Sequence, residues 1–330
     1  RDRGFGGIYG VGKAAAHPPA LVVLSHKPAK SSKAIAWVGK GIVYDTGGLS
    51  IKTKTGMPGM KRDCGGAAGI LGAFYVAVKN GFQDTLHCVL CLAENAVGPL
   101  ATRPDDIHTM YSGKTVEINN TDAEGRLVLS DGVAYASKVG SCHFKVKLMT
   151  NIFTHQDLGC DIVLDMATLT GAQGISTGKY HAMHLSNADN WETAVSEAGR
   201  VSGDLSFPGV RKSEFKKVFV ILKFHHPQVY CPELQYPEFS SSVADMKNSV
   251  ADRGNAQSSC AGLFINSHLG FEWPGVWMHV DMAAPAYTGE RATGYGVALL
   301  NVLFGDSSGA AMLRSAAPKC HHDNGESDHE

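Results

Sequence analysis

The sequence predicts an α/β fold in which a mixed central β-sheet carries helices on both faces. Near-continuous apolar segments alternate with segments of helical pattern along most of the chain, as in sheets that are covered on both sides. The chain has 330 residues, of which 44% are hydrophobic, so it can bury a large core. Active sites of such sheets lie beyond the carboxyl ends of strands, so functional residues are expected there.

The elements follow in chain order. Residues 1–20 are rich in glycine, alanine and proline and are expected to form an irregular lead-in. Strands are predicted at short apolar runs, namely 20–24, 34–44, 85–93, 115–118, 161–169 and 276–282. Helices are predicted at 67–79, 127–137 and 258–269, and Asn80-Gly81 is expected to end the first of them.

One domain is expected over residues 1–305, followed by a disordered tail over 306–330 that is rich in serine and alanine and then in histidine and acidic residues. Two segments, 138–156 and 209–228, have no clear period and are expected to be insertions. Residues 1–4 are neither a start methionine nor a signal peptide, so we expect that an N-terminal domain is missing.

Composition argues against several classes of function. The formal net charge is −1, and the sequence has no basic block that would indicate a nucleic-acid or anionic-membrane surface. No apolar run approaches the roughly 18 residues that a membrane-spanning helix needs. Cys88 and Cys91 lie in an apolar run, which fits a buried strand better than a zinc site. Reduced thiols are the default for these scattered cysteines, which predicts a cytoplasmic protein.

Two short stretches concentrate charged residues among glycines and apolar runs. They hold four carboxylates, two lysines and an arginine, namely Lys40, Asp45, Lys52 and Asp63 in the first and Asp122, Glu124 and Arg126 in the second. Bringing four carboxylates together is costly unless strong positive charge lies between them. Two divalent cations would supply that charge, so the sequence predicts a metal-dependent hydrolase.

The remaining cations have a different expected role. Two dications would balance the four carboxylates, and Lys40 could add a neutral nitrogen ligand. Lys52 and Arg126 then have no carboxylate left to pair with. We expect both to stabilise the oxyanion that forms when metal-bound hydroxide attacks a carbonyl. Mostly oxygen ligands leave zinc, manganese, cobalt and magnesium open.

These stretches resemble a known family. Residues 119–127 are similar to the signature of the leucine aminopeptidase family of two-metal exopeptidases, and residues 39–63 match that family's other metal-binding stretch in type and spacing. The resemblance extends over most of residues 1–304. It implies a two-metal aminopeptidase that removes an apolar, leucine-like N-terminal residue from peptides. It also implies an α/β catalytic domain that follows a smaller N-terminal domain, and assembly into hexamers.

The resemblance also implies a role for each motif residue. Asp45 and Glu124 would bridge two divalent ions, zinc or manganese, while Lys40 and Asp63 would complete the tighter site and Asp122 the more exchangeable one. Lys52 and Arg126 would be the catalytic pair, with Arg126 holding a bicarbonate that acts as general base. Substrate would be contacted by Met60, in the pocket for the N-terminal side chain, and along its backbone by Thr168, Leu169 and Gly171.

Rival interpretations remain. Gly174-Ile-Ser-Thr-Gly178 fits the nucleophile-elbow pattern of a serine hydrolase with Ser176 as nucleophile, but the preceding strand is expected to end several residues earlier. Residues 7–14 nearly fit a phosphate-binding loop, yet Ala14 stands where Ser or Thr would hold magnesium. A third possibility is a metal-binding scaffold or pseudoenzyme, impaired by the missing N-terminal region and the two extra segments.

Overall fold

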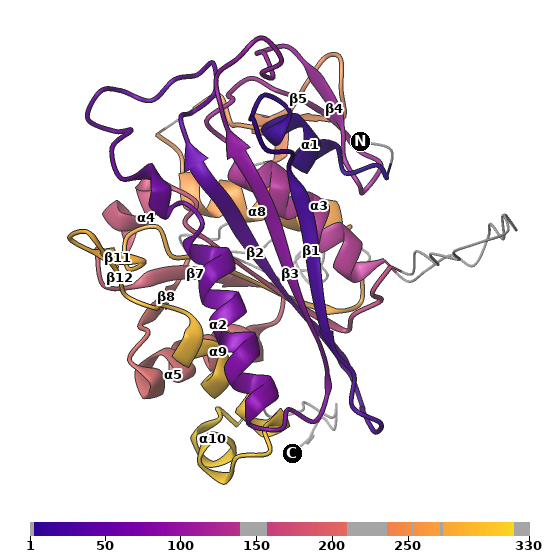
Figure 1. Ribbon diagram of the computed structural model, residues 1–330, viewed down its shortest axis with the longest axis vertical. Coiled ribbons are helices and arrows are strands. Elements are labelled where there is room, and N and C mark those ends of the chain that lie inside the picture. Colours follow the sequence, from indigo (N-terminus) through magenta and orange to yellow (C-terminus); the bar gives the residue numbers. More distant parts are fainter. Residues whose placement is uncertain (1–2, 139–156, 210–235, 253, 271–272, 320–330) are drawn as a thin grey trace, which may run out of the picture.

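The computed structural model describes residues 3–138, 157–209, 236–252, 254–270 and 273–319. Within these residues, the centre of the fold is a seven-stranded sheet (Figure 1). Its strands, in spatial order, are β1 (Ala20–His26), β3 (Thr85–Asn95), β2 (Ala34–Asp45), β6 (Ile162–Ala167), β10 (Val276–Asp281), β7 (Ala182–Ser186) and β8 (Ser206–Pro208).

The sheet is mixed, which confirms the predicted fold class. The four central strands β3, β2, β6 and β10 run parallel to one another, and β8 runs parallel to β7. Strands β1 and β7 run antiparallel to β3 and β10. The predicted strands at 20–24, 34–44, 85–93, 161–169 and 276–282 all belong to this sheet, with ends that differ by a few residues.

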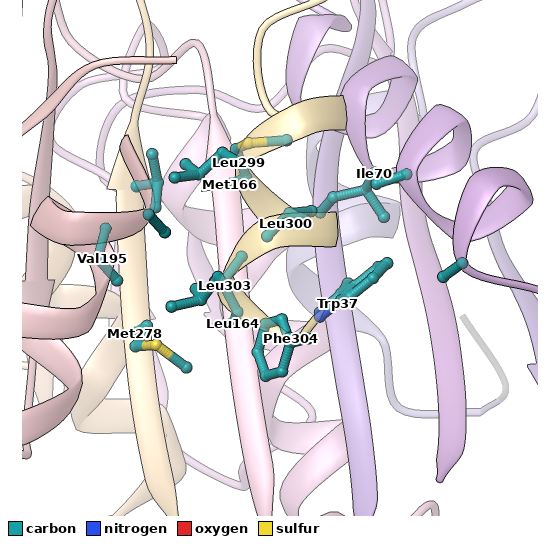
Figure 2. Packing of buried hydrophobic residues seen from close by; sticks show 14 of the residues in the cluster. Trp37, Ile70, Leu164, Met166, Val195, Met278, Leu299, Leu300, Leu303 and Phe304 are labelled. Carbon is teal, nitrogen blue, oxygen red and sulfur yellow. The ribbon is translucent and has the colours of Figure 1, made fainter. Parts of the chain in front are cut away.

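Helices cover both faces. Helices α2 (Gly65–Lys79), α5 (Asp189–Ser202) and α9 (Val297–Leu303) contribute to the hydrophobic core on one face. Helices α1 (Gly6–Gly12), α3 (Gly125–Ser137) and α8 (Gln257–Leu269) contribute to the core on the other face. Figure 2 shows part of the first core, where side chains of α9 lie between Ile70 of α2 and Val195 of α5, next to Leu164 and Met166 of β6.

Smaller elements surround the sheet. A three-stranded sheet joins β4 (Ile107–Thr109), β5 (Thr115–Glu117) and β9 (Met246–Lys247), so the strand predicted at 115–118 exists but lies outside the central sheet. A hairpin joins β11 (Tyr287–Thr288) and β12 (Arg291–Ala292). Short helical turns complete the described part of the chain, namely η1 (Met60–Arg62), α4 (Gly171–Ser176), η2 (Tyr236–Phe239), η3 (Gly305–Ser307) and α10 (Ala311–Ala316).

The two ends of the chain differ from the prediction. The expected irregular lead-in contains α1, and the expected disordered tail contains η3 and α10. The tail is ordered over its described part because Gly305 lies against the Leu313 carbonyl and Arg314 donates a hydrogen bond to the Ser308 carbonyl at 2.7 Å. Residues 320–330 lie outside the described residues, as do both predicted insertions except Lys138 and Gly209.

No helix in the described part of the chain is both long and apolar enough to cross a membrane.

Candidate metal centre

The charged residues of the two motif stretches meet around the carboxyl-terminal parts of β2 and β6, close to where the sequence predicted functional residues. Strands β2 and β6 pair as far as Gly39 and Met166, and Lys40 comes directly after that pair. Asp45 ends β2, while Asp63 follows η1 and precedes α2. The other two carboxylates belong to the turn that leads into α3, in which Glu124 is the residue before the helix.

Lys40 lies at the centre of one half of the cluster. Its amine is 2.9 Å from Oδ2 of Asp63 and 2.8 Å from Oε1 of Glu124, and it donates to the Thr168 carbonyl at 3.0 Å. Burial alone would lower the pKa of Lys40, but the charges of Asp63, Glu124 and Asp45 outweigh it and raise that pKa. These carboxylates favour an ammonium ion, whereas the neutral amine expected from the sequence applies to Lys40 beside bound dications.

Lys52 lies at the centre of the other half. Its amine is 2.7 Å from Oδ2 of Asp45 and 2.6 Å from Oδ1 of Asp122. Lys52 thus contacts two of the carboxylates that were expected to bind metal, which the sequence did not predict. Arg126 was expected to lack a carboxylate as well; its Nη1 donates to the backbone carbonyl of Asn248 at 3.0 Å.

The donor atoms fit divalent cations. Oxygens of Asp45, Asp122 and Glu124 lie within 4.8 Å of one another. Oε2 of Glu124 is buried and has no hydrogen-bond partner among the described residues. Asp63 belongs to the same cluster through Lys40, which contacts both Asp63 and Glu124. Four carboxylates and two ammonium groups leave an excess of negative charge that hard cations would offset.

The pKa values of the carboxyl groups reflect this crowding. Burial, followed by the charge of Asp45, raises the pKa of Glu124 to about 8. Burial also raises the pKa of Asp63 to about 6, although Lys40 opposes the shift. The pKa of Asp122 is raised by burial and by Asp45. A bound cation would favour the ionised form of each group and so reverse the direction of these shifts.

Two asparagines that the sequence analysis did not single out as site residues hold the motif stretches in place. Asn95, the last residue of β3, donates from Nδ2 to Oδ1 of Asp45 at 2.8 Å and to the Thr121 carbonyl at 3.1 Å. Asn248 accepts from the backbone of Asn119 and donates to the carbonyl of Asn120 at 2.6 Å. In the sequence, an asparagine after a buried strand could have indicated such a role. Its hydrogen-bond partners could not be predicted, because they come from distant parts of the chain.

The predicted substrate residues line one cleft together with the cluster. Met60, Thr168, Leu169 and Gly171 all face a cavity of about 500 Å³ that also contains the seven charged motif residues. Thr168 additionally donates from Oγ1 to Oδ1 of Asp63 at 2.8 Å. The cleft is therefore large enough for a few residues of a peptide beside the metal centre.

The geometry does not support the rival sites. Ser176 is the last residue of α4, and its hydroxyl donates to the Gln173 carbonyl at 3.0 Å, whereas a nucleophile elbow places its serine between a strand and the start of a helix. Residues 7–12 belong to α1 and do not follow a strand, as a phosphate-binding loop requires. Cys88 and Cys91 are free, buried thiols on β3, as the apolar run predicted.

Comparison with known proteins points in the same direction. The model of the cytosol aminopeptidase family, catalytic domain, matches residues 1–219 and 228–301. The human protein "Probable aminopeptidase NPEPL1" is 64% identical over 318 residues, which are 96% of this chain and 54% of that protein. "Leucine aminopeptidase 1" of Caenorhabditis elegans is 48% identical over 94% of this chain and 56% of that protein. The chain thus spans about half the length of these relatives.

Solved structures agree with the sequence matches. The leucine aminopeptidase of Caenorhabditis elegans superposes with a TM-score of 0.81, covering 94% of this chain and 56% of that chain, at 48% identity. The leucyl aminopeptidase of Trypanosoma brucei in complex with bestatin gives a TM-score of 0.76 at 46% identity, covering 91% of this chain and 51% of that chain.

Proposed function

This chain belongs to the cytosol aminopeptidase family, and we propose that it is a two-metal aminopeptidase that hydrolyses the first peptide bond of peptides with a free N-terminus. One observation carries the proposal. Four carboxylates converge at the ends of β2 and β6, and one of them, Glu124, keeps a buried oxygen without a hydrogen-bond partner in the described part of the chain. A cleft beside them has room for substrate.

We assign the metal-holding role to Lys40, Asp45, Asp63, Asp122 and Glu124. When bound, two divalent ions such as zinc or manganese would polarise the scissile carbonyl and lower the pKa of water. The chain's own residues prepare the site. Asn95 fixes the orientation of the Asp45 carboxylate, and Thr168 fixes that of Asp63, because each donates one hydrogen bond to it.

We assign Lys52 and Arg126 the role of stabilising the negative charge that develops on the carbonyl oxygen. Both face the cleft from opposite motif stretches. A lysine is ordinarily a cation at neutral pH, and although burial would lower the pKa of Lys52, Asp45 and Asp122 raise it. A fixed cation that meets charge formed only in the transition state accelerates the chemical step. We also propose Arg126 as the binding residue for a bicarbonate general base.

Activity on a leucyl substrate tests the proposal. Release of leucine from leucine p-nitroanilide by the purified chain should require added manganese or zinc and should stop with a chelator. Metal content per chain should be measured on the same sample. Activity that resists a chelator but is abolished by a serine-directed reagent would contradict the proposal and favour Ser176.

Mutations should separate the two groups of residues. Asp63→Ala removes a ligand and should lower metal content. Lys52→Ala should retain metal and cut turnover by roughly 100- to 1,000-fold, the usual loss for one oxyanion stabiliser. Lys54→Ala, an exposed lysine two residues away, is the matched control and should change neither quantity. If Lys52→Ala loses its metal as Asp63→Ala does, the division of roles is wrong.

The remaining family properties are proposed on the same basis. Short peptides with an apolar, leucine-like first residue are the proposed substrates, since Met60 lines the cleft. A homo-hexamer in the cytoplasm is the proposed assembly and location. Sedimentation of the purified chain tests the proposed hexamer, and a monomer would contradict it.

A further inference from the structure

Arg62 lies in the cleft in an arrangement that the proposed chemistry does not use. It is the last residue of η1, two residues after Met60, and its guanidinium carbon is 3.6 Å from the centre of the Tyr287 ring. Tyr287 begins the hairpin strand β11, so the contact joins two distant parts of the chain. Both side chains line the same cleft as the metal centre.

The guanidinium group is also confined from a second direction. Gly59 has a φ of 90°, and a Cβ atom at this position would lie only 2.7 Å from Nη1 of Arg62. The positive φ favours a glycine here, because other residues rarely adopt it, and the missing side chain leaves room for the guanidinium in its observed position. Arg62 is held between the Gly59 backbone and the Tyr287 ring, and its orientation is set before substrate arrives.

Stacking on an aromatic ring occupies the face of a guanidinium and leaves the N–H groups at its edge available. Among the described residues, none forms an ion pair or a hydrogen bond with the Arg62 side chain. The other cations of the cleft differ in this respect. Lys40 and Lys52 each contact two carboxylates, and Arg126 donates to the Asn248 carbonyl.

A carboxylate is the ligand that best matches this group. The planar fork of a guanidinium binds the two oxygens of a carboxylate side by side, and a preoriented fork loses little entropy on binding. Peptides supply carboxylates from two sources, an acidic side chain and the C-terminus of a short peptide. We propose that Arg62 binds a carboxylate of the peptide substrate and so determines specificity; the inference rests on the proposed peptidase function.

The test compares matched peptides with the purified full chain loaded with manganese. One pair is Leu-Ala-Ala with a free C-terminus and the same peptide as its C-terminal amide. A second pair, both as amides, is Leu-Glu-Ala and Leu-Gln-Ala, and a third is Glu-Ala-Ala and Gln-Ala-Ala. The wild type should prefer the carboxylate member of at least one pair, and that pair identifies the source.

Arg62→Gln should abolish that preference. We expect kcat/KM for the preferred carboxylate peptide to fall by about 10- to 100-fold, mainly through KM, as for loss of a hydrogen bond between charged groups. The neutral partner peptide should change by less than about twofold, because Arg62 does not contact the reacting atoms in this proposal. Arg62→Lys keeps the charge without the fork and should retain part of the preference.

Lys61→Gln is the control, since Lys61 is an exposed neighbour whose ion pair with Glu290 is solvated. Thermal unfolding and metal content should match the wild type for all three variants. A wild type without preference in any pair, or an equal loss on both members of a pair, overturns the proposal. If the wild type hydrolyses no peptide, the peptidase function fails instead. Calorimetric binding of the same pairs to the wild type and Arg62→Gln then still decides the role of Arg62.

Discussion

Thr168 connects the end of the central sheet to the metal centre in two ways. Its backbone carbonyl accepts a hydrogen bond from Lys40, and its hydroxyl donates one to Asp63 at 2.8 Å. The hydroxyl leaves Oδ2 of Asp63 facing the amine of Lys40. A single side chain that does not belong to the charged cluster thus sets the orientation of one proposed ligand.

Thr168→Val should therefore weaken metal binding without removing a ligand. Valine has a similar shape but cannot donate to Asp63, so the carboxylate loses its fixed orientation. Loss of such a partner typically costs about 10- to 100-fold in metal affinity. Competition against a fluorescent zinc chelator measures this change. Thr288→Val, on the exposed hairpin, is the control. An unchanged affinity in Thr168→Val would show that Lys40 alone orients Asp63.

Glycines allow α2 to approach the sheet closely where the site is formed. A Cβ atom on Gly66 would lie 2.1 Å from the Met166 carbonyl oxygen of β6. A Cβ atom on Gly39 of β2 would lie 2.6 Å from Cα of Ala67. This approach brings the start of α2, and with it Asp63, to the amine of Lys40.

Gly66→Ala should separate α2 from the sheet and disturb the metal centre together with the core. We expect a loss of at least about 1–3 kcal/mol in the free energy of unfolding, the usual cost of overpacking, and a lower metal content. Gly98→Ala is the control, because a Cβ there would meet its nearest atom at an ordinary 3.5 Å. Urea unfolding and metal analysis check both effects. Destabilisation with full metal content would show that the site tolerates a shift of α2.

The end of β10 is hydrogen-bonded to the segment that leads from β6 to α4. Asp281 is fully buried and accepts hydrogen bonds from the backbone amides of Leu169 and Ala283 and from the Thr170 hydroxyl at 2.6 Å. Because Leu169 and Thr170 line the cleft, the carboxylate of Asp281 positions part of the substrate site without facing it.

Asp281→Ala should leave these buried donors without an acceptor. We expect roughly 3–5 kcal/mol less stability, the range for breaking a buried polar network, and a higher KM for peptides. Asp306→Ala, an exposed acidic residue, should behave as the wild type. Urea unfolding and steady-state kinetics measure the two effects. A stable variant with an unchanged KM would show that water or another side chain replaces Asp281.

Across the fold, the features that could be predicted from the sequence are those whose determinants are local. The seven charged motif residues lie in two short stretches beside glycines, and the structure brings them together. The pair of Arg62 and Tyr287 was not predicted, because its members are distant in the chain and meet only after folding.

Helix α1 and strand β7 were not predicted from the sequence, because tertiary contacts outweigh the local sequence pattern in both. Helix α1 is rich in glycine, which disfavours helix, but Gly7 and Gly10 allow it to lie against Leu127 and His108. Strand β7 contains His184, which interrupts its apolar run, yet this histidine is fully buried.

Two buried histidines on opposite faces of the sheet make stability depend on pH. His184 of β7 interacts through Nδ1 with the Ser206 hydroxyl at 2.7 Å, and burial lowers its pKa to about 4. His268 of α8 interacts with the Ser112 hydroxyl at 2.7 Å, and burial lowers its pKa to about 3. Both are neutral in the folded protein, whereas an unfolded histidine has a pKa near 6.5.

These pKa values determine how the free energy of unfolding changes with pH. Each depressed pKa contributes stability that is complete above about pH 6.5 and is lost as the pH falls toward the folded pKa. At pH 5 the loss is about 2 kcal/mol for each histidine. Asp131 acts in the opposite direction, because burial raises its pKa to about 7 and the folded state takes up its proton as the pH falls. The histidine contribution must therefore be isolated by mutation.

The double variant His184→Gln, His268→Gln isolates the contribution of these two histidines to the pH dependence of stability. Glutamine keeps polar atoms but does not titrate, so the variant should be less stable than the wild type at pH 7.5 and should lose about 4 kcal/mol less between pH 7.5 and pH 5. Urea unfolding at half-unit steps of pH, with a chelator present throughout, gives both profiles. Because Asp131 titrates in both proteins, its contribution cancels in the difference. Parallel profiles would mean that these histidines already take up protons in the folded state near pH 6.5, against their burial.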